Sequence, residues 1–170
     1  MLTFIGLGLY DERSITVEGR EAVADADRVF AEFYTSKLAG ATVEELSAYH
    51  GVEIDVRDRS GVEEEPESIL ESAAEGDVVF LTAGDPMIST THVDLRLRAA
   101  ERGIDTRIVH GTTAGSAAAS LTGLQQKARQ GHPFGPRGAQ EFGAFGQGDE
   151  SGRAGFGTKS PRRAIARRRR

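Results

Sequence analysis

Short apolar runs alternate with helix-like stretches along the first 124 residues of the chain. The apolar runs predict five strands, at 2–8, 28–33, 53–56, 77–83 and 105–109. The stretches between and after them predict helices that include 17–26, 66–74 and 114–121. Strands that alternate with helices pair in parallel. The pattern therefore predicts an α/β fold with one open, mainly parallel, doubly wound sheet of about five strands.

Polar residues and glycine mark where several of these helices begin and end. Thr16 is available as an N-cap, and Thr42 with Glu45 fits a capping box, in which each side chain satisfies a free backbone amide. Thr91 opens another helix, and Gly103 suits the left-handed position that follows a helix end. These signals support the same order of elements.

Three loops lie where ligands usually bind on such a sheet, at the carboxyl ends of its strands. They are 6–11, 84–88 and 111–115. Gly6-Leu-Gly8 would let the backbone approach a nucleotide closely. It lacks the third glycine of a dinucleotide fingerprint and the lysine of a phosphate loop, so a plain turn explains it equally well. Gly84-Asp85-Pro86 is either a tight turn or part of a ligand site.

Aromatic and polar side chains also follow the second strand. Glu32-Phe33-Tyr34-Thr35 places a carboxylate, two rings and a hydroxyl at a strand end. Core packing accounts for one ring, and the whole group indicates a rim that faces a substrate. Glu63-Glu64-Glu65 is interpreted as a solvated loop.

The sequence offers no metal site. There is no cysteine, which excludes a disulfide framework and a thiolate site. The histidines of the first 124 residues lack metal-binding spacing and are interpreted as surface or capping residues; they are His50, His92 and His110.

The charge differs sharply between two parts of the chain. Residues 1–124 carry 10 Lys+Arg and 23 Asp+Glu, a net of −13, whereas 125–170 carry 11 and 3, a net of +8. The −5 of the whole chain is therefore a cancellation. The acidity of the first part suggests a halophile's surface, with an ordinary acidic enzyme as the alternative. The N-terminus reads as a strand, and no apolar run approaches roughly 18 residues, so we expect a soluble, cytoplasmic protein.

The composition of the second part predicts a disordered tail after an α/β domain at 1–124. Residues 125–170 hold 9 Gly and 3 Pro, and Ile165 is their only branched aliphatic residue. Such a segment cannot bury enough apolar surface to offset its chain entropy. Its basic residues, which end in four arginines, could alternatively bind nucleic acid nonspecifically.

Taken together, the motifs resemble the diphthine synthase family. They are Phe-Ile-Gly-Leu-Gly-Leu-Tyr-Asp-Glu-Arg from residue 4, Phe-Ala-Glu-Phe-Tyr-Thr-Ser from 30, Leu-Thr-Ala-Gly-Asp-Pro-Met-Ile-Ser-Thr-Thr-His from 81 and Ser-Leu-Thr-Gly-Leu-Gln from 120. The resemblance covers 1–125 in order. It implies a tetrapyrrole-methylase-like enzyme that binds S-adenosylmethionine between two α/β domains.

The resemblance also implies cofactor contacts at five positions. They are Leu9, Asp85, Ile88, Thr113 and Ala114, of which the last two lie in a looser match to the family. Family members methylate the amino group of a 3-amino-3-carboxypropyl side chain on a histidine of elongation factor 2, and they suggest a homodimer. Transfer from a sulfonium to a neutral amine depends on alignment more than on a strong base, and we assign no catalytic residue. A corrin or porphyrin substrate is the alternative, against which the Glu-Phe-Tyr-Thr segment argues.

The resemblance ends after Gln125, and the family's second domain does not follow. Arg129-Gln130-Gly131-His132 can be encoded by codons that, read one base later, give Gly-Lys-Ala-Thr, as in the family's continuation. We therefore expect the tail to be a frameshift product and the chain to be a truncated fragment of such an enzyme, which could be inactive.

Limited proteolysis tests the expected boundary. We expect a protease to remove 126–170 quickly and to leave a resistant core at 1–124, because only that part has a periodic apolar pattern. Mass spectrometry of the fragments locates the cut. A tail that resists cleavage as well as the first part does would contradict the expectation.

Overall fold

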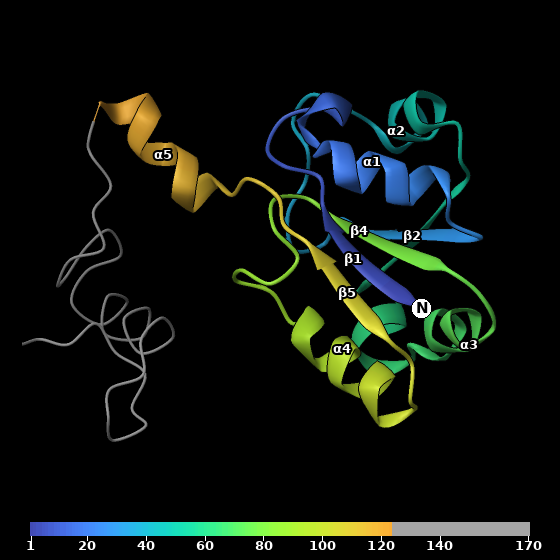
Figure 1. Cartoon of the computed structure of the whole chain (residues 1–170). Helices are drawn as coiled ribbons and strands as arrows, with labels where there is room; N and C mark the ends of the chain where they lie inside the picture. The colour runs from blue at the N-terminus through green and yellow to red at the C-terminus, as the bar shows by residue number, and fades with distance from the viewer. Residues whose placement is uncertain (124–170) are drawn as a thin grey trace, which may run out of the picture. The chain divides into compact units, whose positions relative to one another are not determined.

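The structure is a computed structural model that describes residues 1–123 (Figure 1). One compact unit comprises Met1–Ala118, and a second begins at Ala119. The strands are β1 Leu2–Gly6, β2 Arg28–Glu32, β3 Ile54–Arg57, β4 Val78–Thr82 and β5 Thr106–Val109. The α-helices are α1 Val17–Ala24, α2 Val43–His50, α3 Glu67–Glu75, α4 His92–Glu101 and α5 Ala114–Thr122. A 3₁₀ turn, η1 (Glu12–Ser14), and a π-helical turn, η2 (Ser60–Glu64), complete the described elements.

All five strands form one sheet in the order β3-β2-β4-β1-β5, and every pair within it is parallel. Helices α1 and α2 cover one face of this sheet, and α3 and α4 cover the other (Figure 1). The predicted α/β class, strand number and parallel, doubly wound arrangement are thus confirmed.

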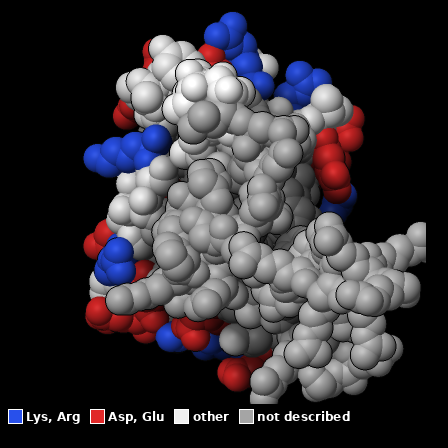
Figure 2. Space-filling model, turned by 90° about the vertical axis from the view of Figure 1, so that its left-hand side faces the viewer, with Lys and Arg blue, Asp and Glu red and all other residues white. Residues whose placement is uncertain are grey.

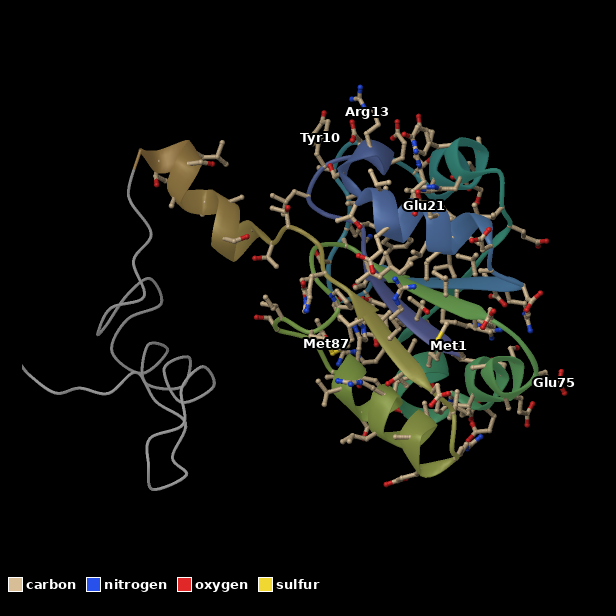
Figure 3. All side chains as sticks on the ribbon, viewed as in Figure 1. Met1, Tyr10, Arg13, Glu21, Glu75 and Met87 are labelled. Atoms are coloured by element: carbon tan, nitrogen blue, oxygen red, sulfur yellow. The ribbon has the colours of Figure 1, made fainter. Side chains whose placement is uncertain are left out.

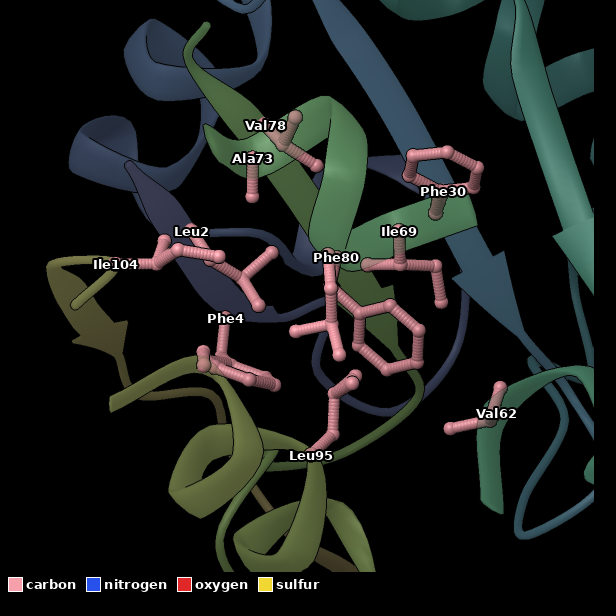
Figure 4. Close-up of a cluster of buried hydrophobic side chains, with 12 residues drawn as sticks. Leu2, Phe4, Phe30, Val62, Ile69, Ala73, Val78, Phe80, Leu95 and Ile104 are labelled. Carbon is pink, nitrogen blue, oxygen red and sulfur yellow. The ribbon is translucent and has the colours of Figure 1, made fainter. Parts of the chain in front are cut away.

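Each face of the sheet has its own hydrophobic core, because side chains alternate along a buried strand. Phe4 of β1 and Phe80 of β4 pack toward α3 and α4, with ring centroids 5.8 Å apart (Figure 4). Their neighbours Ile5 and Leu81 belong to the opposite core, which includes Val23 of α1 and Leu46 of α2. Burial on both faces explains why β4 reads as an unbroken apolar run.

The predicted helix-end signals have the expected geometry. Thr42 and Glu45 form the reciprocal capping box at the start of α2, and Thr16 Oγ1 accepts the amide of Gly19 at the start of α1. Gly103 follows α4 with a φ of 71°. The elements themselves are one or two residues shorter than predicted at several ends, as for β1 and α1.

Glu64 and Glu65 are exposed, as predicted for a solvated segment, but the prediction of a loop at 63–65 is corrected, because part of the segment is helical. Ser60–Glu64 forms the π-helical turn η2, and Val62 within it is only 2% exposed. Glu63 accepts a hydrogen bond from the Thr91 hydroxyl and pairs with Arg59. Burial of one apolar side chain therefore holds this acidic turn against the sheet.

No helix in the described part of the chain is long and apolar enough to cross a membrane. The predicted tail at 125–170, its disorder and its basic charge lie outside the described residues. The proposed boundary at residue 124 falls at the edge of the description.

Candidate functional site

The sheet changes winding direction between its neighbouring strands β1 and β4. The helix after β1 lies on one face and the helix after β4 lies on the other (Figure 1). Open α/β sheets bind ligands at such a switch point, outside the carboxyl ends of the strands. In Figure 3, Met87 in the loop after β4 lies at this end of the sheet, and Glu75 lies at the opposite end.

The loops after β1, β4 and β5 meet there through glycine backbone. Gly8 and Gly84 exchange two backbone hydrogen bonds, of 3.2 and 2.7 Å. A Cβ atom on Gly111 would lie 2.8 Å from the carbonyl carbon of Gly6 and closer still to the Gly84 oxygen. A Cβ on Gly6 would in turn lie 2.7 Å from the Gly111 nitrogen. Only glycine at positions 6 and 111 permits this close approach of three segments of the chain.

Asp85 anchors the second loop to the third. Its side chain is 3% exposed, and Oδ2 lies 2.7 Å from His110 Nδ1 and accepts the Gly111 amide at 3.2 Å. The other oxygen accepts the Met87 amide at 2.8 Å. One buried carboxylate thus shapes its own loop and holds the chain that leaves β5.

Beside this junction the loop surface is open and partly apolar. Ile88 is 43% exposed, and Leu9 is half-buried. Gly84 has a φ of 78°, and a Cβ placed on it would meet nothing within 4 Å. Ser89, next to Ile88, has a φ of 57°, a conformation that a non-glycine residue rarely adopts. Figure 2 shows both acidic and basic side chains on the visible surface of the described residues.

Thr113 and Ala114 follow Gly111 by two and three residues. Thr113 Oγ1 accepts the Ser116 amide, and the Ser116 hydroxyl accepts the Thr113 amide, so Thr113 caps the start of α5. Three of the five sequence-predicted residues, Leu9, Asp85 and Ile88, lie in two loops that are joined by backbone hydrogen bonds. In the described part of the chain, Thr113 and Ala114 reach that group only through the backbone from Gly111.

A second polar cluster lies at the ends of β2 and β4. Glu32 and Thr82 are register partners, and the Thr82 hydroxyl donates to Glu32 Oε1 at 2.5 Å. The Thr35 hydroxyl donates to the same oxygen at 2.5 Å, and the amides of Tyr34 and Thr35 donate to Oε2 at 3.0 Å each. His92 Nε2 lies 3.2 Å from Oε1. The segment predicted as a substrate-facing rim therefore turns its carboxylate inward.

Glu32 stays ionised inside the protein. Burial alone would raise the pKa of its carboxyl group, but the close contact with His92 and the hydrogen bonds from Thr35 and Thr82 together outweigh burial and lower that pKa to about 2. The carboxylate is fully buried, so its charge depends on these donors.

Tyr34 does not provide a base. Burial, aided by the charges of Glu32 and Glu63, raises the pKa of its phenol to about 12. The phenol oxygen lies near Thr91 without a hydrogen bond of good geometry, and the guanidinium of Arg59 lies 5.0 Å from the ring. The phenol keeps its hydrogen at neutral pH.

The structure corrects the interpretation of His92 as a surface or capping residue. Its side chain is fully buried, and the ring packs edge-on against Phe80 with centroids 5.2 Å apart. His110 is exposed, yet it contacts Asp85. Sequence spacing carries no signal for either contact, since the partners are 60 and 25 residues away. Among residues 1–123 no group of three or more His, Cys, Asp or Glu could hold a metal ion.

Comparison with known families accounts for this arrangement. A sequence model described as tetrapyrrole (corrin/porphyrin) methylases matches residues 1–134. The chain belongs to the tetrapyrrole methylase family. The resemblance to diphthine synthases seen in the motifs is also confirmed. A diphthine synthase from Natronomonas pharaonis is 76% identical over 125 residues, and one from Halorubrum lacusprofundi is 74% identical over 125 residues.

The match covers only part of each tetrapyrrole methylase relative. Both alignments cover 74% of this chain and 47% of the relative, so the chain spans about half the length of the curated relatives it matches. A crystal structure of a diphthine synthase superposes with a TM-score of 0.71 at 44% identity, covering 73% of this chain and 49% of that one. The haloarchaeal origin of these relatives is consistent with the halophilic origin that the acidity of residues 1–124 suggests.

The glycine junction predicts a specific steric defect. Gly111→Ala should destabilise the protein by about 1–3 kcal/mol, because every atom that the new methyl group meets is backbone and cannot rotate away. Urea unfolding measures the change. Gly61→Ala is the matched control, since its Cβ would come no closer than 3.3 Å to a neighbour. Equal stabilities of the two variants would contradict the packing described here.

The low pKa of Glu32 predicts that the folded protein loses stability in acid. Its pKa is about 2 in the folded protein against an ordinary 4.5, so its contribution is present above pH 4.5 and disappears as the pH falls toward 2. That contribution is about 3 kcal/mol. Urea unfolding of the parent and of Glu32→Gln from pH 6 to pH 2.5 should show this slope only in the parent. Glu75→Gln, on the exposed side of α3, should keep the parent's slope.

Proposed function

We propose that residues 1–124 form the cofactor-binding part of an S-adenosylmethionine-dependent methyltransferase of the diphthine synthase type. The observation that carries the proposal is the junction of three glycine-containing loops around buried Asp85, at the switch point of the sheet. The chain that forms this junction is 76% identical over 125 residues to a diphthine synthase. The identity supports this type over a corrin or porphyrin methyltransferase.

The residues at the junction fit S-adenosylmethionine. Its nucleoside needs close backbone approach and an apolar wall, which open space beside Gly84 and the side chains of Leu9 and Ile88 provide. Its charged methionine end needs polar groups, and the Asp85 loop offers backbone groups that the buried Asp85 carboxylate holds in place. We assign Thr113 and Ala114 to the same site, at the start of α5, where the hydroxyls of Thr113 and Ser116 hold the first turn in place.

When bound, the cofactor supplies a methyl group activated by a sulfonium. This chain's residues bind and align it, and none of them is assigned as a base or nucleophile. Asp85 holds its loop through Met87 and holds Gly111 in the neighbouring loop, so it fixes the two backbones that would flank the cofactor. Alignment of this kind lowers the barrier of an in-line transfer.

The proposed substrate is elongation factor 2 that carries a 3-amino-3-carboxypropyl group on a histidine, and the amino group of that side chain accepts the methyl. Because translation takes place in the cytoplasm, the proposal puts the protein there. In this proposal the working enzyme has a second domain as the opposite wall of the cofactor site and is a homodimer.

A chimera tests the proposed function. Residues 1–125 of this chain, joined to the remaining part of the Natronomonas pharaonis diphthine synthase, should bind S-adenosylmethionine and methylate modified elongation factor 2. Asp85→Asn in the chimera should weaken cofactor binding about tenfold or more, as expected for loss of charged hydrogen bonds. Asp94→Asn, on the exposed side of α4, is the control. Calorimetry and transfer of a labelled methyl group are the measurements.

The 170-residue chain is assayed beside the chimera. Small-molecule sites bury about 70–90% of their ligand, so a chain that spans half of its relatives should bind the cofactor weakly and transfer no methyl group. Full activity of this chain would show that the second half is not needed. An inactive chimera, beside an active Natronomonas enzyme, would contradict the proposed function.

A further inference from the structure

His92 lies between two loops that end different strands. It is the first residue of α4, and its ring is fully buried against Phe80. Nδ1 lies 3.3 Å from the carbonyl oxygen of Pro86, in the loop after β4. Nε2 lies 3.2 Å from Glu32, which holds the loop after β2. The two ring nitrogens therefore face two different loops.

At this contact Glu32 can only accept hydrogen bonds. Four donors from Tyr34, Thr35 and Thr82 point at its two oxygens. A carboxylate with four donors is the ionised form, which has no hydrogen to give to an imidazole. The Pro86 carbonyl is likewise an acceptor.

Because both partners of the ring are acceptors, they determine how many N–H hydrogens the His92 ring carries. A neutral imidazole has one N–H and one lone pair, so one of its nitrogens would place a lone pair against an acceptor. Only the doubly protonated ring satisfies both contacts. The Nε2 contact does not have the geometry of a hydrogen bond, so it acts as a close ion pair between two buried groups.

We propose that His92 is a positioning residue: a buried imidazolium that couples the loop at 33–35, through Glu32, to the cofactor loop at 84–88, through Pro86. The coupling role rests on the proposed function, because it assumes that 84–88 holds the cofactor. Removal of either contact should loosen one loop first, and the two contacts can be removed separately.

Nitrogen NMR of the full chain tests the protonation. With histidines labelled by ¹⁵N, the ring signals of His92 are identified by their absence in His92→Gln. Both nitrogens should show the shifts of N–H groups at pH 7. A nitrogen of His92 with the shift of a bare lone pair would overturn the proposal.

Two conservative variants separate the contacts. The Asn amide in His92→Asn lies near the position of Nδ1 and can still donate to Pro86, whereas the Gln amide in His92→Gln reaches farther, toward Glu32. Hydrogen exchange should therefore quicken about fivefold to tenfold at the Tyr34 and Thr35 amides in the Asn variant, and at the Met87 amide in the Gln variant.

His50→Asn, a half-buried histidine on α2, is the control and should change neither loop. Equal quickening of both loops in both His92 variants would show a merely structural residue and overturn the proposal. No quickening in either loop would overturn it as well.

Cofactor titration separates this inference from the proposed function. If the full chain or the chimera binds S-adenosylmethionine, the dissociation constant should rise about tenfold in His92→Gln and stay within about twofold in His92→Asn. A Gln variant that binds as tightly as His50→Asn would overturn the coupling. Absence of cofactor binding by the parent chimera would count against the proposed function, and the ring shifts and exchange pattern would then decide the inference alone.

Discussion

The close approach of three backbones at the carboxyl ends of β1, β4 and β5 is the constraint on which the site depends. Gly6 and Gly111 leave no room for a Cβ atom, because each lies against the other and against the backbone oxygen of Gly84. These contacts hold loops together that would otherwise diverge at the switch point of the sheet. A loop that must carry a ligand group is usually mobile. Here the glycine contacts and buried Asp85 fix the loop backbone to the sheet.

A buried carboxylate likewise holds a loop in place at the ends of β2 and β4. Glu32 is the last residue of β2, and its oxygens gather donors from its own loop, from β4 and from α4. An isolated carboxylate in such a core would be costly, and full satisfaction turns it into a point to which separate elements are tied. The candidate site is therefore bordered by two carboxylates, Asp85 and Glu32, each of which organises a loop by accepting backbone amides.

The described unit is well packed, and the candidate site lies at its edge. The two cores on the two faces of the sheet are contained within residues 1–118, so folding of this unit uses its own helices. The loops that we propose to bind the cofactor lie at the edge of that unit, beside exposed surface such as Ile88. In the proposed enzyme the other half of the relatives' length supplies the cover.

Local pattern was sufficient for the order and type of the elements. The buried run of β4, the capping box at Thr42 and the left-handed Gly103 all depend on residues that are close in sequence. The same pattern located the three loops, since strand ends follow from the strands. The fully buried state of His92, its ion pair with Glu32 and the contact of His110 with Asp85 depended on tertiary structure. The spacing of hydrophobic residues indicates which face of an element is buried, but it does not indicate which distant polar groups come into contact. Those contacts are decided when the strand order brings the ends of the strands together.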